Sequence, residues 1–193
     1  MVRLTALAAL LAAVFALPAP ATAQDASDAW AALLEPGTVA IMRHALAPGT
    51  GDPATFQLGD CSTQRNLNDA GRDQAQRIGQ AFRDTGIAVD RVLTSQWCRC
   101  RQTAELLDLA PVEDLPALNS FFEDRSTRDQ QTAAVREFLA DAPEGEKLVL
   151  VTHQVNVTAL TDVFPSSGEV VVIEVGDDGT VEVRGTVLIR APR

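Results

Sequence analysis

Three short apolar runs, each about the length of a buried strand, constrain the fold of this chain more than any other feature. They occupy residues 39–42, 91–95 and 148–152, the second of them within a strand predicted at 87–95, and the segments between them carry apolar residues at helical spacing. The run at 148–152 is apolar up to its last residue, as is typical of a central strand that is covered on both faces. Strands that alternate with helices predict an α/β architecture built on a parallel sheet.

Two further strand-like runs close the chain. Residues 169–175 and 181–189 flank the turn sequence Gly176-Asp177-Asp178-Gly179, which predicts a β-hairpin. We therefore predict an α/β sandwich whose mostly parallel central sheet has an antiparallel edge. The expected helices cover residues 29–34, 97–109, 127–140 and 157–163, and another runs from Asn68 to the break at Gly86.

Two local features refine this prediction. In the helix at 127–140, the residues expected to face inward are Ala134, Val135, Phe138 and Leu139. The stretch 45–63, rich in Gly, Pro, Asp and Thr, is predicted to be a loop. A loop of this length in a compact domain is usually functional, and its place after the first strand favours contact with a substrate.

The first residues have the pattern of a secretory signal. Arg3 supplies a short positive region, residues 4–17 are apolar, and Ala21-Thr22-Ala23 gives the small-x-small cleavage pattern ahead of Gln24. The apolar region is shorter than the ~20 residues that span a bilayer. We therefore expect a signal peptide at residues 1–23, one folded domain at 24–193, and export to the periplasm or the cell exterior.

The charge of the chain restricts its partners. The formal net charge is −10 at pH 7, which disfavours nucleic acid and anionic membrane surfaces as ligands. We expect no stable membrane insertion, and the sequence does not predict an oligomeric state. An anion-binding site in such a chain requires a local cluster of basic side chains.

The three cysteines of the chain are Cys61, Cys98 and Cys100. Cys98 and Cys100 are two residues apart in a predicted helix, so they point to different sides and are not expected to pair with each other. In an oxidising compartment the first expected pair is Cys61 with Cys98 and the second is Cys61 with Cys100. Three unpaired thiols stay open as an alternative. The spacings match no zinc-ligand pattern, so no metal site is predicted.

The chain has two histidines, of which His44 follows the run at 39–42 after one intervening residue and His153 directly follows the run at 148–152. Arg43 precedes the first, and Arg99 lies four residues after the run that ends at Ser95. The carboxyl ends of parallel strands are where α/β sheets bind ligands. Arginine offers forked donors that match phosphoryl oxygens, and a neutral imidazole is a nucleophile toward phosphorus. Backbone N–H groups of Ser95 and of the following helix start are expected to point at the same anion.

Four segments in this order resemble the motifs of the histidine phosphatase (phosphoglycerate mutase-like) superfamily: Arg43-His44-Ala45, 67–75, 94–104 and 149–153. The resemblance implies a three-layer α/β/α sandwich that needs no metal or cofactor. It implies that His44 is the phosphorylated nucleophile and that Arg43, Arg99 and His153 bind the phosphate. Ala45 stands where the family has glycine, and alanine would be strained there if the backbone had positive φ. Gln154 likewise stands where glycine is common.

The resemblance also implies a carboxylate that protonates the leaving oxygen. We choose Glu123 for this role, with Asp124 as the nearest alternative and Glu113 and Asp114 further upstream. Four other polar residues are open between a site role and an ordinary one: for Gln154 and Asn156 the alternative is a helix cap, and for Arg65 and Arg101 it is a surface charge.

The predicted function is an exported phosphomonoester hydrolase that works through phosphohistidine on His44. Resemblance to exported family members points to a phosphorylated envelope sugar as one substrate class. The alternative is a non-catalytic protein that binds or senses phosphate or a phosphoester on the same fold. The altered position Ala45 and the choice of acid keep this alternative open.

Overall fold

The computed structural model describes residues 21–143 and 145–192, and side chains from residue 25 onward. Most of the predicted signal peptide, residues 1–23, lies outside the described residues. Its last three positions begin helix α1 (Ala21–Ala32), which therefore runs across the expected cleavage position before Gln24. Cleavage and export stay predictions.

A mixed sheet of six strands forms the centre of the molecule, in the order β3-β2-β4-β1-β5-β6. The first four strands in this order are parallel to one another, β5 runs antiparallel to β1, and β6 runs antiparallel to β5. The predicted fold class is therefore confirmed. The strands are β1 (Thr38–Arg43), β2 (Arg91–Thr94), β3 (Val112–Asp114), β4 (Leu148–Thr152), β5 (Glu169–Val175) and β6 (Val181–Leu188).

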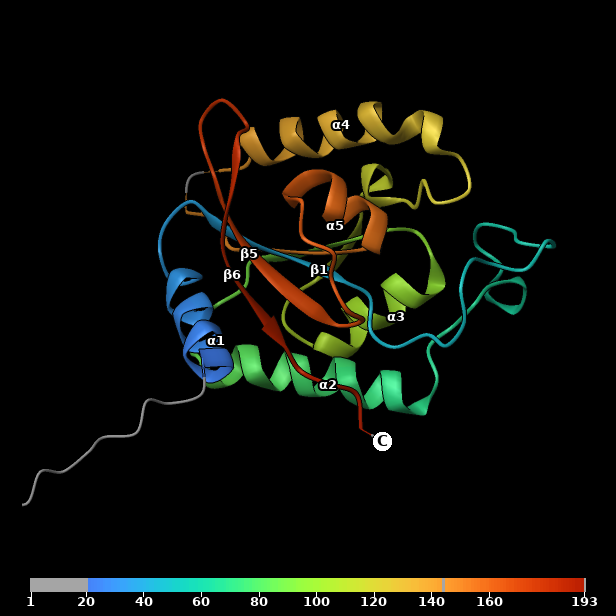
Figure 1. Ribbon diagram of the computed structural model, residues 1–193, viewed down its shortest axis with the longest axis horizontal. Coiled ribbons are helices and arrows are strands. Elements are labelled where there is room, and N and C mark those ends of the chain that lie inside the picture. The colour runs from blue at the N-terminus through green and yellow to red at the C-terminus, as the bar shows by residue number, and fades with distance from the viewer. Residues whose placement is uncertain (1–20, 144, 193) are drawn as a thin grey trace, which may run out of the picture.

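Helices cover both faces of the sheet and make a three-layer sandwich. In Figure 1, α4 and α5 lie above the sheet, and α1 and α2 lie below it. One core cluster joins α1, α2 and α3 to Ala40 and Met42 of β1, and a second joins α4 and α5 to Val39 and Ile41. Successive side chains of a strand point to opposite faces, so a fully apolar strand contributes to both cores. The helices are α2 (Asp69–Asp84), α3 (Cys98–Leu107), α4 (Arg128–Ala140) and α5 (Gln154–Thr161).

Helix α2 begins and packs as its sequence predicts. Asn68 is the N-cap, because its side-chain oxygen accepts a hydrogen bond of 2.9 Å from the backbone N–H of Gly71. The apolar face of the helix is buried through Ala75, Ile78 and Phe82. At Gly79 a Cβ atom would lie 2.0 Å from the carbonyl oxygen of Leu107, so the missing side chain lets α2 approach the end of α3.

The second strand is shorter than predicted. Residues 87–95 were expected to form it, but β2 covers only Arg91–Thr94. Its partner β4 begins at Leu148, which pairs with Arg91, so the residues before Arg91 have no strand to pair with. The three-residue strand β3 at the sheet edge, next to β2, was not predicted, since a run this short has too few residues to show alternation.

Two helical predictions are also corrected. Ala134 in α4 was expected to face the core but is exposed, while Val135 and Leu139 are buried. Helix α5 was expected at 157–163 but begins at Gln154, directly after His153. None of the described helices is both long enough and apolar enough to cross a membrane.

Candidate active site

The two histidines lie side by side at the carboxyl edge of the sheet. His44 follows β1 and His153 follows β4, which are neighbouring parallel strands. The backbone N–H of His44 donates to the carbonyl of Thr152 at 2.9 Å, which continues the strand pairing by one residue. The two imidazole rings are 5.6 Å apart between centroids. The sheet itself therefore fixes the distance between them.

His44 is held as a neutral imidazole whose lone pair is on Nε2. Its side chain is buried, and Nδ1 lies 2.7 Å from the carbonyl oxygen of Ala45. A carbonyl can only accept a hydrogen bond, so the proton sits on Nδ1 and the lone pair on Nε2. Burial, and then the charge of Arg99, hold the pKa of His44 well below its usual value. This is the form of histidine that attacks phosphorus.

Arg99, at the start of α3, joins both histidines. Its Nε donates to Nε2 of His44 at 3.2 Å, and its Nη2 lies 3.4 Å from Nδ1 of His153. Its terminal nitrogens also donate to the two carboxylate oxygens of Asp52, at 2.7 and 3.1 Å. Arg99 is buried, so these contacts fix the guanidinium between the histidines and the loop.

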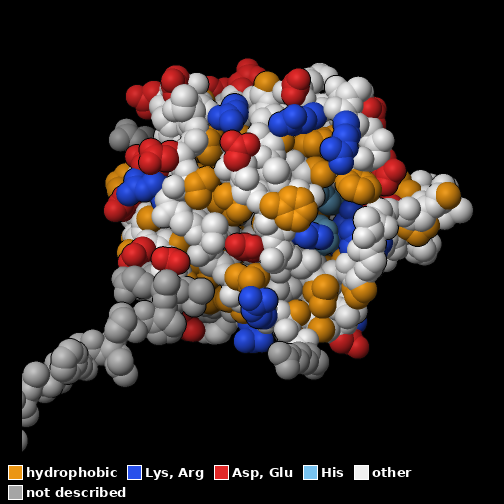
Figure 2. All heavy atoms as spheres, in the orientation of Figure 1, with side chains coloured by type: hydrophobic (Ala, Val, Ile, Leu, Met, Phe, Trp, Pro, Cys, Tyr) orange, Lys and Arg blue, Asp and Glu red, His pale blue; other side chains and the backbone are white. Residues whose placement is uncertain are grey.

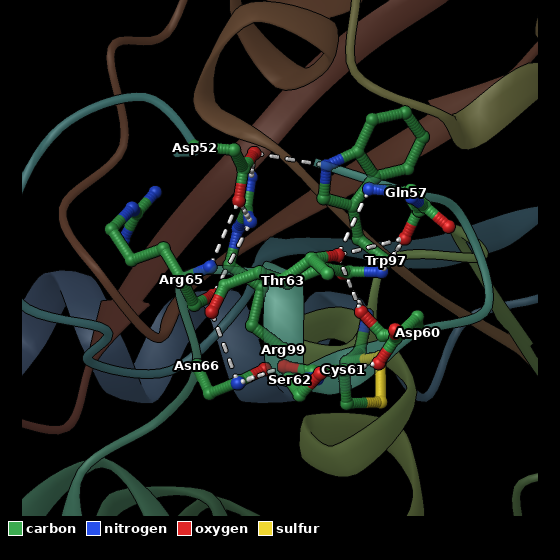
Figure 3. The surroundings of a disulfide bond; sticks show 12 residues. Asp52, Gln57, Asp60, Cys61, Ser62, Thr63, Arg65, Asn66, Trp97 and Arg99 are labelled. Atoms are coloured by element: carbon green, nitrogen blue, oxygen red, sulfur yellow. Dashed lines mark hydrogen bonds and ion pairs between the residues drawn. A yellow bond between two sulfur atoms is a disulfide. The ribbon is translucent and has the colours of Figure 1, made fainter. Parts of the chain in front are cut away.

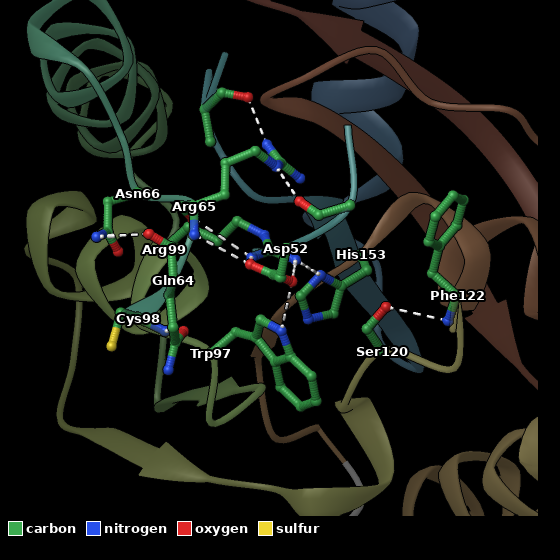
Figure 4. Close-up of polar contacts among 12 residues, drawn as sticks. Asp52, Gln64, Arg65, Asn66, Trp97, Cys98, Arg99, Ser120, Phe122 and His153 are labelled. Atoms are coloured by element: carbon green, nitrogen blue, oxygen red, sulfur yellow. Dashed lines mark hydrogen bonds and ion pairs between the residues drawn. The ribbon is translucent and has the colours of Figure 1, made fainter. Parts of the chain in front are cut away.

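Asp52 belongs to the loop after β1 and was not predicted as a site residue. It accepts further hydrogen bonds from Trp97 Nε1 and from the backbone N–H of Arg65, each at 3.0 Å (Figure 4). Burial acts to raise the pKa of Asp52, but the hydrogen bonds from Arg99 and Arg65 outweigh it and leave the pKa below its usual value. Asp52 is therefore a carboxylate held inside a cluster of basic groups.

His153 takes part in a hydrogen-bonded chain. Its Nδ1 faces the donor Nη2 of Arg99, so the proton sits on Nε2, which lies 2.8 Å from the hydroxyl oxygen of Ser95. The Ser95 hydroxyl in turn donates to Oδ1 of Asn119 at 3.2 Å. Burial, followed by the charge of Arg99, holds the pKa of His153 well below its usual value. Both histidines are thus neutral at pH 7.

Two more arginines line the same cavity. Arg43 donates from Nη1 to the carbonyl of Pro165 at 3.2 Å, while its buried Nε has no partner among the described residues. Arg65 holds the loop after β1 through two hydrogen bonds. It donates from Nε to the carbonyl of Gly51 at 2.8 Å and from Nη1 to the carbonyl of Ala47. Burial and the charge of Arg99 lower the pKa of Arg65 to about 10. These guanidiniums make the local basic cluster that an acidic chain needs in order to bind an anion.

The cavity has a volume of about 720 Å³, with the buried residues His44, Arg99 and His153 at its base and the exposed residues Phe122, Glu123, Asp124 and Phe164 at its mouth. In Figure 2, orange side chains surround a hollow in which blue and pale-blue atoms are visible. The structure brings all the predicted site residues to this one cavity: Arg43, His44, Arg99, Glu123 and His153. Phe122 and Phe164, which were not predicted, line it as well.

Glu123 and Asp124, the two candidates for the acid, both line the cavity but differ in their contacts. The carboxylate of Asp124 accepts from the backbone N–H of Ser126 at 3.0 Å and from its hydroxyl at 2.6 Å. Asp124 thereby caps the short turn η3 (Arg125–Thr127). Glu123 has no such role, and its Oε1 lies 3.3 Å from the position of a Cβ on Gly51, next to Asp52. Glu123 is therefore the freer carboxylate of the two.

The secondary candidates divide between cavity and surface. Arg65 and Gln154 line the cavity, whereas Arg101 forms an exposed ion pair with Asp114. Asn156 donates to the carbonyl of Asn119 at 2.9 Å and does not line the cavity. Neither Gln154 nor Asn156 caps α5, whose N-cap residue is His153. Among the described residues, no group of three or more His, Cys, Asp or Glu side chains is arranged to hold a metal ion.

For residues 95–98, the prediction that backbone N–H groups after β2 point at an anion is wrong, because the protein uses these donors itself. Ser95 N–H continues the sheet by donating to Val151, and Trp97 N–H donates to the Ser95 hydroxyl. Gln96 N–H donates to Asn119 Oδ1 and Cys98 N–H to Gln64 Oε1, each at 2.9 Å. Side chains, rather than this backbone segment, supply the donors of the cavity.

A disulfide joins Cys61 to Cys98, with their Cα atoms 5.7 Å apart (Figure 3). This is the pairing expected first, and Cys100 is left as a buried free thiol whose pKa burial raises to about 12. The bond ties the loop after β1 to the residue that precedes Arg99. Phe56 of the same loop stacks on Trp97, with ring centroids 5.0 Å apart.

Ala45 is accommodated without strain. In the described chain, Asp108 and Asp162 are the only residues other than glycine with positive φ, so Ala45 does not need the conformational freedom of glycine. Ala45 is fully buried, and its N–H donates to the hydroxyl of Thr103 at 3.1 Å. The methyl group at this position therefore leaves the geometry of His44 intact.

Comparison with known proteins shows similarity to one family over part of the chain. The model of the histidine phosphatase superfamily (branch 1) matches residues 39–122. The serine/threonine-protein phosphatase Pgam5, mitochondrial, of Drosophila grimshawi is 34% identical over 69 residues, which are 33% of this chain and 24% of that protein. The chain thus spans about a quarter of the length of this relative.

Solved structures show the same fold at low sequence identity. The protein histidine phosphatase SixA complexed with tungstate is 18% identical, covers 78% of this chain and 96% of its own, and has a TM-score of 0.53. A mycobacterial glucosyl-3-phosphoglycerate phosphatase is 14% identical, with coverage of 81% and 99% and a TM-score of 0.52. Residues 39–122, from β1 to β3, are thus similar to the histidine phosphatase superfamily, branch 1, and the chain shares the fold of these solved structures.

Proposed function

We propose that this protein is a phosphomonoester hydrolase that forms a phosphohistidine on His44. One observation carries the proposal. Nδ1 of His44 is fixed against the Ala45 carbonyl, so Nε2 presents its lone pair to a cavity lined by Arg43, Arg65 and Arg99. A nucleophile in the correct tautomer beside guanidiniums that stabilise phosphoryl charge is the arrangement that phosphoryl transfer requires.

In the first step Nε2 of His44 attacks the phosphorus of the ester. The bond from phosphorus to the leaving oxygen breaks, its electron pair stays on that oxygen, and Glu123 in its acid form supplies the proton. Arg99 shifts its donors from His44 and Asp52 to the phosphoryl oxygens. Arg43, which has an unused donor, also stabilises the charge on the transferring group, while His153 helps to position Arg99 through its Nδ1.

In the second step a water molecule attacks the phosphohistidine. The bond from phosphorus to Nε2 breaks and its electron pair returns to the ring, while Glu123, now a carboxylate, accepts the proton of the water. Inorganic phosphate leaves and His44 is again neutral. The lowered pKa of His44 favours this return, because the free imidazole does not take up a proton at pH 7.

The proposal includes export and a small substrate. The signal-like sequence at residues 1–23 supports an exported enzyme, and the resemblance to exported family members makes phosphorylated envelope sugars one class to include among the substrates tested. Detection of the chain in the periplasmic fraction, with residue 24 at its N-terminus, is the expected result. Retention of residues 1–23 on the purified protein would contradict the signal-peptide assignment.

The test of the mechanism is phosphate release from an aryl phosphate by the purified protein and its variants. His44→Ala is expected to reduce activity to the background, and acid-labile labelling by a radioactive phosphoester should disappear with it. Arg99→Ala should lower kcat/KM roughly 100- to 1,000-fold, as loss of a charge-stabilising donor does in other sites. Arg101→Ala, on the same helix but outside the cavity, is the matched control. Full activity of His44→Ala would refute the proposal.

Glu123 requires a separate comparison. Glu123→Gln should lower kcat roughly 100-fold or more for an alkyl phosphate, whose leaving oxygen needs a proton. The loss should be much smaller for a nitrophenyl phosphate, whose leaving group is stable as an anion. Asp124→Asn is the matched control, because Asp124 caps a turn. Equal losses of kcat for both esters would show that Glu123 is not the general acid.

A second candidate is a phosphate-binding protein without turnover. The observation that favours it is the contact of Asp52 with Arg99, which places a carboxylate on the donors that the reaction uses. Calorimetry showing that the protein binds inorganic phosphate, combined with no phosphate release from a panel of phosphoesters, would establish this candidate in place of the hydrolase.

A further inference from the structure

We propose that Phe122 and Phe164 form a subsite for the leaving group, and that the preferred substrate is a phosphomonoester whose alcohol has a flat apolar face of about the size of an arene. This inference rests on the proposed function, because it extends outward from the phosphate-binding base of the same cavity. It concerns the part of the substrate that the histidines and arginines do not touch.

The exposure of the two rings supports this subsite. The described chain has five large apolar side chains that are at least 36% exposed, and two of these, Phe122 at 40% and Phe164 at 74%, line the cavity. Apolar side chains that gather at a cavity mouth in this way are typical of ligand-binding grooves. A ligand that covers them removes apolar surface from water, which favours binding.

The two rings are also unoccupied by other aromatic groups. Trp97 already has Phe56 stacked on it at 5.0 Å, and its edge meets the ring of His153 at 5.3 Å. Within the described chain, no ring stacks on Phe122 or Phe164, and both side chains keep surface exposed that a ligand could contact. Figure 4 shows the ring of Phe122 beyond His153, on the side away from Trp97. The exposed ring of Phe122 thus lies on the other side of His153 from Trp97.

The size and charge of the cavity define the ligand further. At about 720 Å³ the cavity lies in the range of roughly 300–1,000 Å³ that holds drug-sized ligands, and a phosphoryl group fills only a small part of it. Val155, Pro53 and Ala54 add apolar wall next to the rings. Glu123 and Asp124 stand at the same mouth, so a leaving group with its own carboxylate or second phosphate meets like charge there.

The test uses pairs of ligands that differ only in the apolar group. Benzylphosphonate and ethylphosphonate are not hydrolysed, so calorimetry with them measures the subsite independently of turnover. Benzyl phosphate and ethyl phosphate have similarly poor leaving alcohols, so their kcat/KM ratio measures the same preference during the reaction. A phosphonate that carries a carboxylate tests the exclusion of anionic leaving groups. Leu34→Ala is the matched control, because Leu34 is 57% exposed but does not line the cavity.

The benzyl ligand is expected to bind roughly tenfold more tightly than the ethyl ligand, as a ring in an apolar subsite does. Phe164→Ala and Phe122→Ala should each reduce that ratio several-fold while leaving phosphate binding unchanged, and Leu34→Ala should not change it. A ratio near one, or a ratio that survives both Phe variants, overturns the subsite even if hydrolysis through His44 is intact. Discrimination between phosphonates without any hydrolysis supports the subsite while rejecting the hydrolase.

Discussion

Asp52 accepts hydrogen bonds from both terminal nitrogens of Arg99, so a carboxylate of the protein already uses the forked donors that a phosphoryl group requires. The pair is nearly buried, with side-chain exposures of 4% for Arg99 and 11% for Asp52. Substrate binding therefore competes with the loop for the same guanidinium.

This competition predicts that Asp52→Asn binds inorganic phosphate more tightly. The amide keeps the shape of the side chain but removes a negative charge from the cavity, so we expect the dissociation constant to fall by roughly three- to tenfold, or ~1 kcal/mol. Calorimetry with phosphate is the measurement. Asp69→Asn, which removes an equal charge from an exposed position, is the control. Weaker binding by Asp52→Asn would instead show that Asp52 holds Arg99 in place.

Because of its two histidines, the folded protein is expected to lose stability in mild acid. Both have pKa values lowered by burial in the folded protein, whereas in the unfolded chain they titrate near about 6.5. Below that pH the unfolded state binds protons that the folded state does not, so the free energy of unfolding falls as the pH falls. The limiting slope is roughly 1.4 kcal/mol per pH unit for each histidine. The pKa of Asp52 is also lowered, so the contribution of its carboxylate to the free energy of unfolding is lost only in stronger acid, below about pH 4.

Urea unfolding between about pH 7.5 and about pH 5.5 measures this effect, because the window lies above the titration of free carboxylates. The chain has no histidine other than His44 and His153. The variant His153→Asn retains only His44, so its free energy of unfolding is expected to keep only part of the pH dependence. A free energy of unfolding that stays constant across the window would contradict the assignment of both histidines as neutral.

Reduction of the disulfide is expected to lower the free energy of unfolding by a large amount. Cys61 and Cys98 are separated by 37 residues, and closing a loop of that size stabilises a fold by up to about 4 kcal/mol. The double variant Cys61→Ser with Cys98→Ser should lose roughly 2–4 kcal/mol in the free energy of unfolding. Reductant should lower the stability of the native protein to the same level and leave the double variant unchanged. A reductant effect on the double variant would contradict this reading, because its only thiol is Cys100.

At Gly79 we expect alanine to destabilise the protein, although alanine has the higher helix propensity. Alanine in place of glycine in a helix normally contributes ~1 kcal/mol of stability. At Gly79 the new Cβ would lie 2.0 Å from the Leu107 carbonyl, so α2 must move away from α3. We expect Gly79→Ala to lose about 2–3 kcal/mol in the free energy of unfolding, as overpacked sites do. Gln76→Ala, on the exposed face of the same helix, should change it by less than about 0.5 kcal/mol.

The parts of the site that could be predicted from the sequence are those fixed by the sheet. His44 and His153 each follow an apolar run, and the rule that parallel strands end at one edge is enough to bring them together. Arg99 could be predicted because it begins the helix after a third run of this kind. These positions depend on patterns that repeat along the chain.

Asp52 could not be predicted, because its position depends on contacts between segments that have no repeating pattern. Its loop is held by Arg65, which donates to two carbonyls of that loop, and by the disulfide to the start of α3. Phe164 was missed for a different reason. A phenylalanine in a sequence is ordinarily expected in the core, and only the structure shows that this one is 74% exposed.

The order of the strands also determines when, during synthesis, a site can exist. β4 lies between β1 and β2 in the sheet but is made after both of them, so His44 and Arg99 leave the ribosome before the strand that aligns them. The segment matched by the family model ends at residue 122, ahead of β4. A nascent chain of that length would contain His44 and the three arginines of the cavity, and β2 could pair with β3, but β1 and β2 would lack the strand β4 that joins them. Binding of phosphate should therefore begin only when the chain has emerged past Thr152.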